Sequence, residues 1–297
     1  MMIYKLFFEE IMEVKAYAKI NLSLFVGAKR EDGYHELESY MQSINLFDRI
    51  RIERNDSGKI SIFCSRPYIP CDERNLAYKA AVRFFDAVGI EDRGLLIDIK
   101  KNVPVGAGLG GGSSDAAAVL VALNKLYDTK LSLSELASIA AKIGADVAFC
   151  VYGGTYLARG IGEILTPAPP MPKTNILVVK PSFSVPTPQA YGLFDAFGEQ
   201  EKPDIDGMKT ALEDGNILKI CASLGNSLQA PVEKEYPKIT EIRNALTKLG
   251  AGGALMSGAG SSVFGIFTDA SLAQKARISL PKAYGQRYIC YPQEGIK

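Results

Sequence analysis

Hydrophobic and polar residues alternate along the first part of the chain in a way that is typical of β-strands. Over residues 13–26 apolar side chains recur at roughly every second position, and a strand that packs one face against a core has this period of two. Shorter runs of the same kind cover residues 50–54 and 59–63. Residues 76–88 instead place apolar side chains at helical spacing and stop at Gly89, a common residue at a helix C-terminus.

Later segments continue this mixture of strands and helices. Ser132 and Glu135 have the spacing of a capping box, and the helix that they would open runs to Gly144. The other predicted elements are strands at 155–158 and 176–179, a helix at 239–249, and two strands flanking a turn at 257–262. The prolines within residues 166–172 cannot support a helix or a central strand. We therefore predict two α+β domains, 1–166 and 167–297, with residues 1–12 as an added tail.

Composition limits the classes of protein to which the chain could belong. Of its 297 residues 47% are hydrophobic and 23% charged, and the formal net charge is +1; this fits a globular protein and argues against broad electrostatic binding of nucleic acid. Two glutamates interrupt the apolar N-terminal segment, so we expect neither a signal peptide nor a membrane span. The five cysteines lack paired spacing, and the single histidine, His35, excludes any centre that needs two. We expect a cytoplasmic protein with reduced thiols.

A glycine-rich stretch from Pro104 to Asp115 is the strongest local signal in the sequence. Its glycines allow sharp turns and a close approach to another molecule, and an Ala- and Leu-rich helix follows. The side chains of Ser113, Ser114 and Asp115 are predicted to cap that helix, whose N-terminal amides favour phosphate. No Gly-Lys-Ser/Thr triplet occurs, so the stretch is not a P-loop.

The same stretch leaves a second class of protein open. Gly106, Gly108 and Gly111 satisfy the G-x-G-x-x-G pattern of dinucleotide-binding folds. That pattern should open a series of alternating strands and helices, with an acidic residue about 20 positions further on. Here the helical pattern continues through residues 125–127. A nucleotide-dependent oxidoreductase therefore stays as an alternative.

Five motifs, in order along the chain, resemble those of the GHMP small-molecule kinases. They are Lys19-Ile20-Asn21-Leu22, Gly33-Tyr34-His35-Glu36-Leu37, the loop 104–115, Gly144-Ala145-Asp146-Val147 and Met256-Ser257-Gly258-Ala259-Gly260. The resemblance extends over residues 16–267. The second and fourth motifs are most similar to the branch of the family that acts on a cytidine-diphosphate substrate.

The resemblance implies a fold and an activity. The expected fold has an N-terminal ATP-binding domain like domain 2 of ribosomal protein S5 and a C-terminal ferredoxin-like domain. The expected reaction is ATP-dependent phosphorylation of the 2-hydroxyl of 4-diphosphocytidyl-2-C-methyl-D-erythritol. That reaction belongs to the methylerythritol-phosphate route to isoprenoid precursors. Mg²⁺ should accompany ATP, because the phosphate oxygens need neutralising.

The resemblance also assigns roles to residues of this chain. Asp146 takes the proton from the substrate hydroxyl, and Lys19 lies between that carboxylate and the transferred phosphate. Contacts to ATP are implied for Asn75, Lys101, Pro104, Gly106, Gly108, Gly110, Gly111, Gly112, Ser113 and Ser114. Contacts to the substrate are implied for Asn21, Tyr34, His35, Asp146, Thr187 and Tyr191; the two tyrosines sandwich the cytosine and His35 donates or accepts a hydrogen bond at it. No acidic metal ligand is evident, so the metal site is left unassigned.

Each of these assignments has an alternative. Lys19 could be an exposed lysine on an edge strand, and Asn21 a strand-end amide. Asp146 could be a helix-end residue and Tyr191 a buried core aromatic. Among whole proteins, a homoserine or mevalonate kinase is the nearest alternative. Such an enzyme has no use for Tyr34, His35 and Tyr191 as a clamp around a base, which we call the base clamp. A non-catalytic RNA-binding module is suggested only by the S5-like topology and is disfavoured by the near-neutral charge.

The chain departs from the family pattern at Tyr17 and Ala148, where proline is common, and at Ala259, where a hydroxyl residue is frequent.

Overall fold

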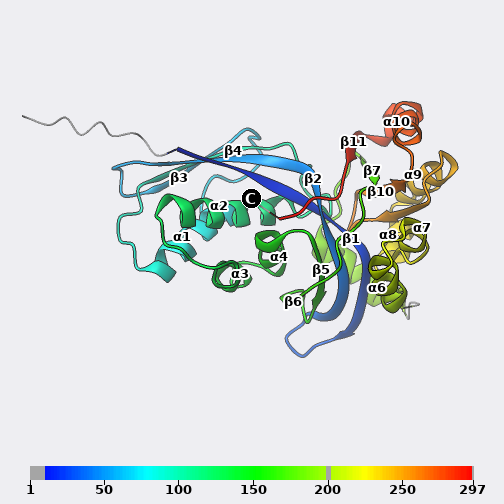
Figure 1. Ribbon diagram of the computed structural model, residues 1–297, viewed down its shortest axis with the longest axis horizontal. Coiled ribbons are helices and arrows are strands. Elements are labelled where there is room, and N and C mark those ends of the chain that lie inside the picture. Colours follow the sequence, from blue (N-terminus) through cyan, green and yellow to red (C-terminus); the bar gives the residue numbers. More distant parts are fainter. Residues whose placement is uncertain (1–10, 199–201, 296–297) are drawn as a thin grey trace, which may run out of the picture.

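The computed structural model describes residues 11–198 and 202–295, which form two sheets with helices around them (Figure 1). The larger sheet has seven strands in the order β3-β4-β2-β1-β8, with β5 paired to β2 and β6 paired to β5. Its strands are β1 (Ile11–Lys29), β2 (His35–Arg54), β3 (Ile60–Cys64), β4 (Leu95–Lys100), β5 (Thr155–Arg159), β6 (Ile164–Pro167) and β8 (Gly225–Asn226). The long antiparallel pair of β1 and β2 forms the central part of this sheet.

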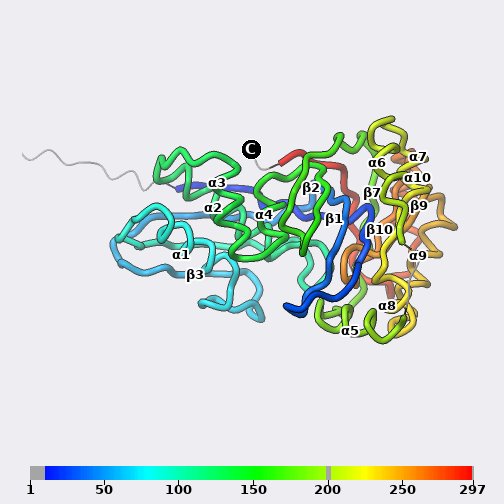
Figure 2. The backbone as a smooth tube through the Cα atoms, turned by 90° about the horizontal axis from the view of Figure 1, so that it is seen from below, coloured from blue at the N-terminus to red at the C-terminus, as the bar shows by residue number. Residues whose placement is uncertain are grey.

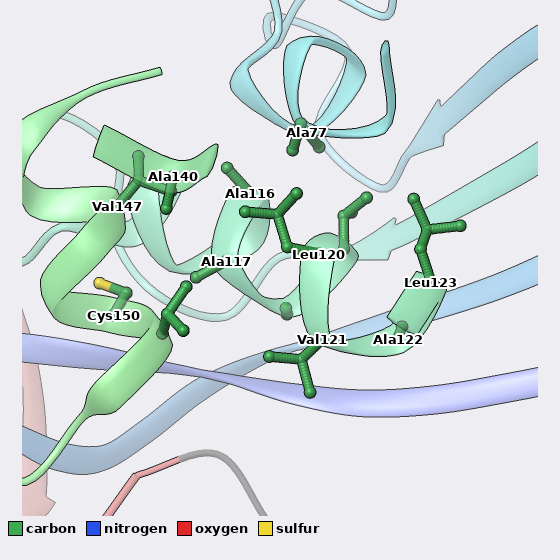
Figure 3. Close-up of a cluster of buried hydrophobic side chains, with 14 of the residues drawn as sticks. Ala77, Ala116, Ala117, Leu120, Val121, Ala122, Leu123, Ala140, Val147 and Cys150 are labelled. Carbon is green, nitrogen blue, oxygen red and sulfur yellow. The ribbon is translucent and has the colours of Figure 1, made fainter. Parts of the chain in front are cut away.

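Four helices, α1 (Leu76–Val88), α2 (Gly111–Leu126), α3 (Leu133–Ala141) and α4 (Ala145–Tyr152), pack with this sheet. The central one is α2, which is buried on every side from Ser114 to Leu123. Its many alanines allow close packing, and Figure 3 shows it meeting Ala77 of α1, Ala140 of α3 and Val147 of α4. Because α2 is buried, its position is fixed, and so is the end of the glycine-rich stretch from which it begins.

The smaller sheet is antiparallel, in the order β11-β7-β10-β9. Its strands are β7 (Asn175–Lys180), β9 (Gly253–Met256), β10 (Val263–Phe267) and β11 (Gln286–Cys290), and the helices of this half are α5 (Thr187–Phe197), α6 (Ile205–Glu213), α7 (Ile217–Ala222), α8 (Gln229–Glu235), α9 (Pro237–Lys248) and α10 (Ala270–Ser279), with a short 3₁₀ turn at Lys282–Tyr284. One group of helices joins β7 to β9, a hairpin joins β9 to β10, and α10 joins β10 to β11. This β-α-β-β-α-β connection confirms the predicted ferredoxin-like half.

The two sheets share a hydrophobic core. Ile20 and Leu22 of β1 and Ile44 of β2 belong to the same buried cluster as Ile176 of β7 and Phe264 of β10. The short strand β8 also pairs in parallel with β1, although it lies in the later part of the chain. Seen from a second direction, the strands β1 and β2 extend towards the later helices, and both contact α6 (Figure 2). The boundary between residues 166 and 167 stays a prediction; it falls inside β6, an edge strand.

Several predicted elements change in extent. The predicted strand 50–54 is only the end of β2, and the helix predicted to run from residue 132 to Gly144 ends at Ala141, before α4 begins. The proposed tail lies outside the described residues except for Ile11 and Met12, which pair with β2 as part of β1. Among the described helices none combines the length and the apolar character needed to cross a bilayer.

Candidate active site

A cleft of about 990 Å³ lies where the glycine-rich loop, β1, the start of α4 and helix α5 meet. It is lined by nearly all of the predicted site residues: Lys19, Asn21, Tyr34, His35, Asn75, Lys101, Pro104, Gly106, Gly108, Gly110, Gly111, Gly112, Ser113, Asp146, Thr187 and Tyr191. These residues come from distant parts of the sequence, from Lys19 to Tyr191. The one predicted site residue that does not line the cleft is Ser114, which is fully buried.

The glycine-rich loop needs glycine for steric reasons. Gly108 and Gly110 have φ of +71° and +67°, a region that other residues rarely adopt. A Cβ on Gly108 would lie 2.0 Å from the backbone oxygen of Ser257, and one on Gly110 would lie 2.9 Å from Cγ of Lys19. The later glycine turn packs directly on this loop, because Ser257 Oγ donates a hydrogen bond of 2.9 Å to the oxygen of Gly108. The two turns, one from each half of the chain, therefore form one wall of the cleft.

Helix α2 begins differently from the prediction. Its N-cap is Gly110, and no side chain caps the first turn. Ser114 Oγ instead donates to the oxygen of Gly111 at 2.9 Å, and Asp115 points to Lys101. The predicted capping role of the serines and of Asp115 is therefore wrong. Because side chains leave these first amides free, the helix N-terminus is suited to an anion.

Lys101 belongs to a buried group of three charges behind the loop. Its Nζ donates to a carboxylate oxygen of Asp48 and, at 2.7 Å, to Asp115 Oδ2. Burial raises the pKa of Asp115 well above its usual range, and Lys101 only partly opposes this. For Lys101 burial acts to lower the pKa, but the two carboxylates outweigh it, and the pKa is raised. The Lys101 ammonium is thus charged and is hydrogen-bonded to the two carboxylates. It lies beside Gly111 and so supports the loop.

Asn75 is also engaged by its own surroundings. Its side chain accepts a hydrogen bond of 2.9 Å from the amide of Ala77, which makes it the N-cap of α1, and it donates one of 2.8 Å to the oxygen of Pro70. Tyr68 and Arg74 line the same end of the cleft and were not identified from the sequence. No local motif marks them.

Lys19 and Asp146 both line the cleft and form an ion pair there. Lys19 lies on β1, where it pairs with Ser43 of β2 and its amide donates to the oxygen of Leu109 in the glycine-rich loop, and it is 4% exposed. The alternative of an exposed lysine on an edge strand is therefore wrong. Its Nζ donates to Asn21 Oδ1 at 2.8 Å and lies 3.5 Å from Asp146 Oδ2. Asp146 is in the first turn of α4, and its side chain is 41% exposed. A charged pair thus lies next to the loop, with the carboxylate open to solvent.

Asn21 has a fixed orientation. Its Nδ2 donates to Ser39 Oγ at 2.8 Å, and that hydroxyl donates to the oxygen of Ser23 at 2.6 Å. These bonds assign the amide, with Oδ1 turned to Lys19. Ser39 was missed in the sequence because nothing in its neighbourhood in the chain indicates that it meets β1.

The other end of the cleft holds the aromatic residues. Tyr34 is 61% exposed, whereas His35 is buried, with its ring centroid 5.5 Å from that of Tyr191. Burial raises the pKa of Tyr191 to about 12, so its phenol stays neutral. Asp195, which the sequence analysis did not identify, has Oδ1 at 2.9 Å from His35 Nε2. Its spacing of four from Tyr191, on the same helix face, is a signal that could have found it.

Comparison with known proteins places the chain in a class. The family model of the GHMP kinases N terminal domain matches residues 75–154, and that of the GHMP kinases C terminal domain matches residues 208–286. The chain therefore belongs to the GHMP kinases, which use ATP as the phosphate donor. The predicted two-domain α+β kinase fold is confirmed.

Individual curated relatives indicate the branch of the family. A 4-diphosphocytidyl-2-C-methyl-D-erythritol kinase of Clostridium perfringens is 46% identical over 89% of this chain and 92% of its own length. A crystal structure of 4-(cytidine 5'-diphospho)-2C-methyl-D-erythritol kinase superposes with a TM-score of 0.80 at 36% identity, covering 96% of this chain and all of the other. A homoserine kinase from Cytophaga hutchinsonii also has a TM-score of 0.80, at 22% identity over 98% of both chains. The latter likeness shows the fold alone, whereas the two former favour the cytidine-diphosphate branch.

Proposed function

We propose that this kinase transfers the γ-phosphate of ATP to the 2-hydroxyl of 4-diphosphocytidyl-2-C-methyl-D-erythritol. The observation that carries the proposal is the pair of Lys19 and Asp146, 3.5 Å apart beside the glycine-rich loop. The identity to relatives with this printed name supports the choice of substrate over homoserine or mevalonate. The doubly wound sheet that an oxidoreductase would need does not match the antiparallel pairing of β1 and β2.

Asp146 and Lys19 divide the chemistry between them. The open carboxylate of Asp146 accepts the proton of the substrate hydroxyl. An ordinary carboxylate is too weak a base to deprotonate an alcohol in advance, so the proton moves late, as the bond to phosphorus forms. The buried ammonium of Lys19 offsets the negative charge of the phosphoryl oxygens and of the carboxylate. Asn21 holds that ammonium in place and contacts the methylerythritol part.

The loop residues from Gly106 to Ser113 hold the phosphates of ATP by their backbone amides, and Pro104, which has no amide hydrogen, lines the cleft beside them. Mg²⁺ accompanies the nucleotide and neutralises its β- and γ-oxygens when bound. The described residues contain no group of three or more His, Cys, Asp or Glu side chains that could hold a metal. The hydroxyl of Ser113 is a suitable oxygen donor in the cleft, and phosphate and water oxygens fit the remaining positions. Ser114 is not retained, since its hydroxyl is bound to Gly111.

Lys101 and Asn75 act through the loop and the adjacent helix in this proposal. Their polar side-chain atoms are hydrogen-bonded to other protein groups, so we propose that they hold the walls of the ATP site in place without contacting ATP directly. Tyr34 and Tyr191 enclose the cytosine, His35 forms a hydrogen bond to it, and Thr187 contacts the diphosphate or the polyol. This base clamp distinguishes the proposed substrate from homoserine and mevalonate.

The test is a phosphate-transfer assay with Mg²⁺ and ATP on four acceptors: the cytidine-diphosphate substrate, mevalonate, homoserine and unlinked methylerythritol phosphate. We expect turnover of the first alone. Asp146→Asn and Lys19→Ala should each lower kcat by roughly a hundredfold or more, because each removes a group that acts on the reacting atoms. Lys219→Ala, which breaks an exposed ion pair with Asp214 outside the cleft, is the control and should leave kcat unchanged. Rates like those of the wild type in both site variants would rule out the mechanism.

A further inference from the structure

Helix α5 presents three polar side chains at intervals of four residues. Thr187, Tyr191 and Asp195 therefore lie along one face of the helix, and all three line the cleft. The proposed function uses the first two. Asp195 has no role in it, although its Oδ1 lies 2.9 Å from Nε2 of His35, the histidine of the base clamp.

The contacts of His35 leave one of its ring nitrogens for a ligand. Nδ1 is 3.0 Å from the backbone oxygen of Gly27. A carbonyl oxygen only accepts, so Nδ1 carries a hydrogen and donates. Nε2 is buried at the cleft and lies 2.9 Å from Asp195 Oδ1, but it makes no hydrogen bond of regular geometry. The ring is thus fixed at one side, and Nε2 and the neighbouring carboxylate remain together at the other.

Asp195 is held as a carboxylate. Lys29 Nζ donates to its Oδ2 at 2.7 Å. This bond from Lys29 lowers the pKa of Asp195, with His35 adding to the effect and partial desolvation opposing it. An ionised carboxylate has only acceptor capacity, and the Asp195 side chain is still 34% exposed. The cleft therefore offers a hydrogen-bond acceptor beside the buried ring of His35.

We propose that Asp195 determines base specificity, by accepting a hydrogen bond from the exocyclic amino group of cytosine. This inference rests on the proposed function. Cytosine has an amino donor at the position where uracil has a carbonyl oxygen. Uracil would therefore place an acceptor against the carboxylate, with no hydrogen between them. Discrimination then comes from repulsion of the wrong base as well as from the bond to the right one.

Binding of CDP and UDP to the whole chain tests this without turnover. We expect the wild type to prefer CDP over UDP by about tenfold or more. Asp195→Asn should remove most of that preference, since an amide can turn its NH₂ group to the uracil oxygen. Asp195→Glu keeps the acceptor and should retain a preference for CDP. Asp214→Asn, which changes another carboxylate in an exposed ion pair with a lysine, should bind both nucleotides as the wild type does.

The ring nitrogens of His35 give a second measurement, because the chain has no other histidine. In ¹H–¹⁵N spectra Asp195→Asn should shift the Nε2 signal and leave Nδ1 nearly unchanged, which also reports that the variant is folded. A wild type without a preference for CDP, or an Asp195→Asn variant that keeps the full preference, would overturn the inference. A preference for CDP that depends on Asp195, in an enzyme that fails to phosphorylate the cytidine-diphosphate substrate, would instead count against the proposed function alone.

Discussion

At Gly108 the glycine-rich loop has no room for a side chain. The residue combines φ of +71° with a Cβ position only 2.0 Å from the oxygen of Ser257. We expect Gly108→Ala to lower the free energy of unfolding by about 1–3 kcal/mol and to raise the KM for ATP, because the loop must move away from the later glycine turn. Urea unfolding and a titration with ATP measure the two effects. Gly112→Ala is the control for stability, since the nearest atom to its new Cβ would be Cδ1 of Leu76 in α1, at an ordinary contact distance of 3.8 Å.

Tyr34 allows a test of stacking with little risk to the fold, because it is 61% exposed. Base stacking on an aromatic ring contributes about 1–3 kcal/mol, so Tyr34→Ala should raise the KM for the cytidine-diphosphate substrate about 5- to 150-fold with kcat little changed. Steady-state kinetics at saturating ATP separate the two constants. Phe63→Ala, an equally exposed aromatic on β3 outside the cleft, should leave both constants unchanged. An unaltered KM in the Tyr34 variant would remove the base clamp from the proposal.

Single residues also show what the sequence could and could not predict. Lys19 and Asp146 were identified because each belongs to a short motif, and the structure brings them within 3.5 Å. Asp48 and Asp195 were not identified, because their importance comes from contacts with Lys101 and His35, which are far from them in the sequence. Long-range pairing of this kind leaves no pattern in the neighbouring sequence.

At the scale of elements, the local rules succeeded where the chain uses local contacts. The capping box of α3 is present: Ser132 Oγ accepts from the amide of Glu135, and Glu135 accepts from the amide of Ser132. For α2 the same type of rule failed, because Asp115 pairs with Lys101 instead of capping the helix. The length of β2 was also missed, since its ladder is completed by β1, β4 and β5.

Helix α3 allows that local rule to be tested separately from catalysis. Ser132→Ala removes the cap and should lower the free energy of unfolding by about 1 kcal/mol. The pKa of Glu135 is lowered by its hydrogen bonds from Ser132. Its part of the stability is therefore present above the unfolded-state pKa and is lost as the pH falls through the folded-state value. The difference between wild type and Ser132→Ala should shrink in acid, which denaturant unfolding at several pH values measures. Ser138→Ala, within the same helix, should be neutral or slightly stabilising.

For the whole molecule, the fold alone does not select the substrate. The homoserine kinase and the cytidine-diphosphate kinase structures superpose equally well on this chain. The side chains that we propose to select the substrate, Tyr34, His35 and Tyr191, all line the cleft. Sequence motifs could therefore indicate the branch of the family, while the shared arrangement of sheets could indicate only the class.

The core shared by the two sheets predicts that the molecule unfolds as one unit. Phe264 of β10 is fully buried in the cluster that also contains Ile20 of β1. Phe264→Ala should lower the free energy of unfolding by about 3–5 kcal/mol. It should also reduce the hydrogen-exchange protection of slow amides in both sheets together, because neither apolar face can remain buried without the other. Phe84→Ala, which removes an equally buried ring among the first four helices, should have the same global effect. If Phe264→Ala weakened protection in β7 and β10 while β4 kept its own, the two halves would be independent folding units.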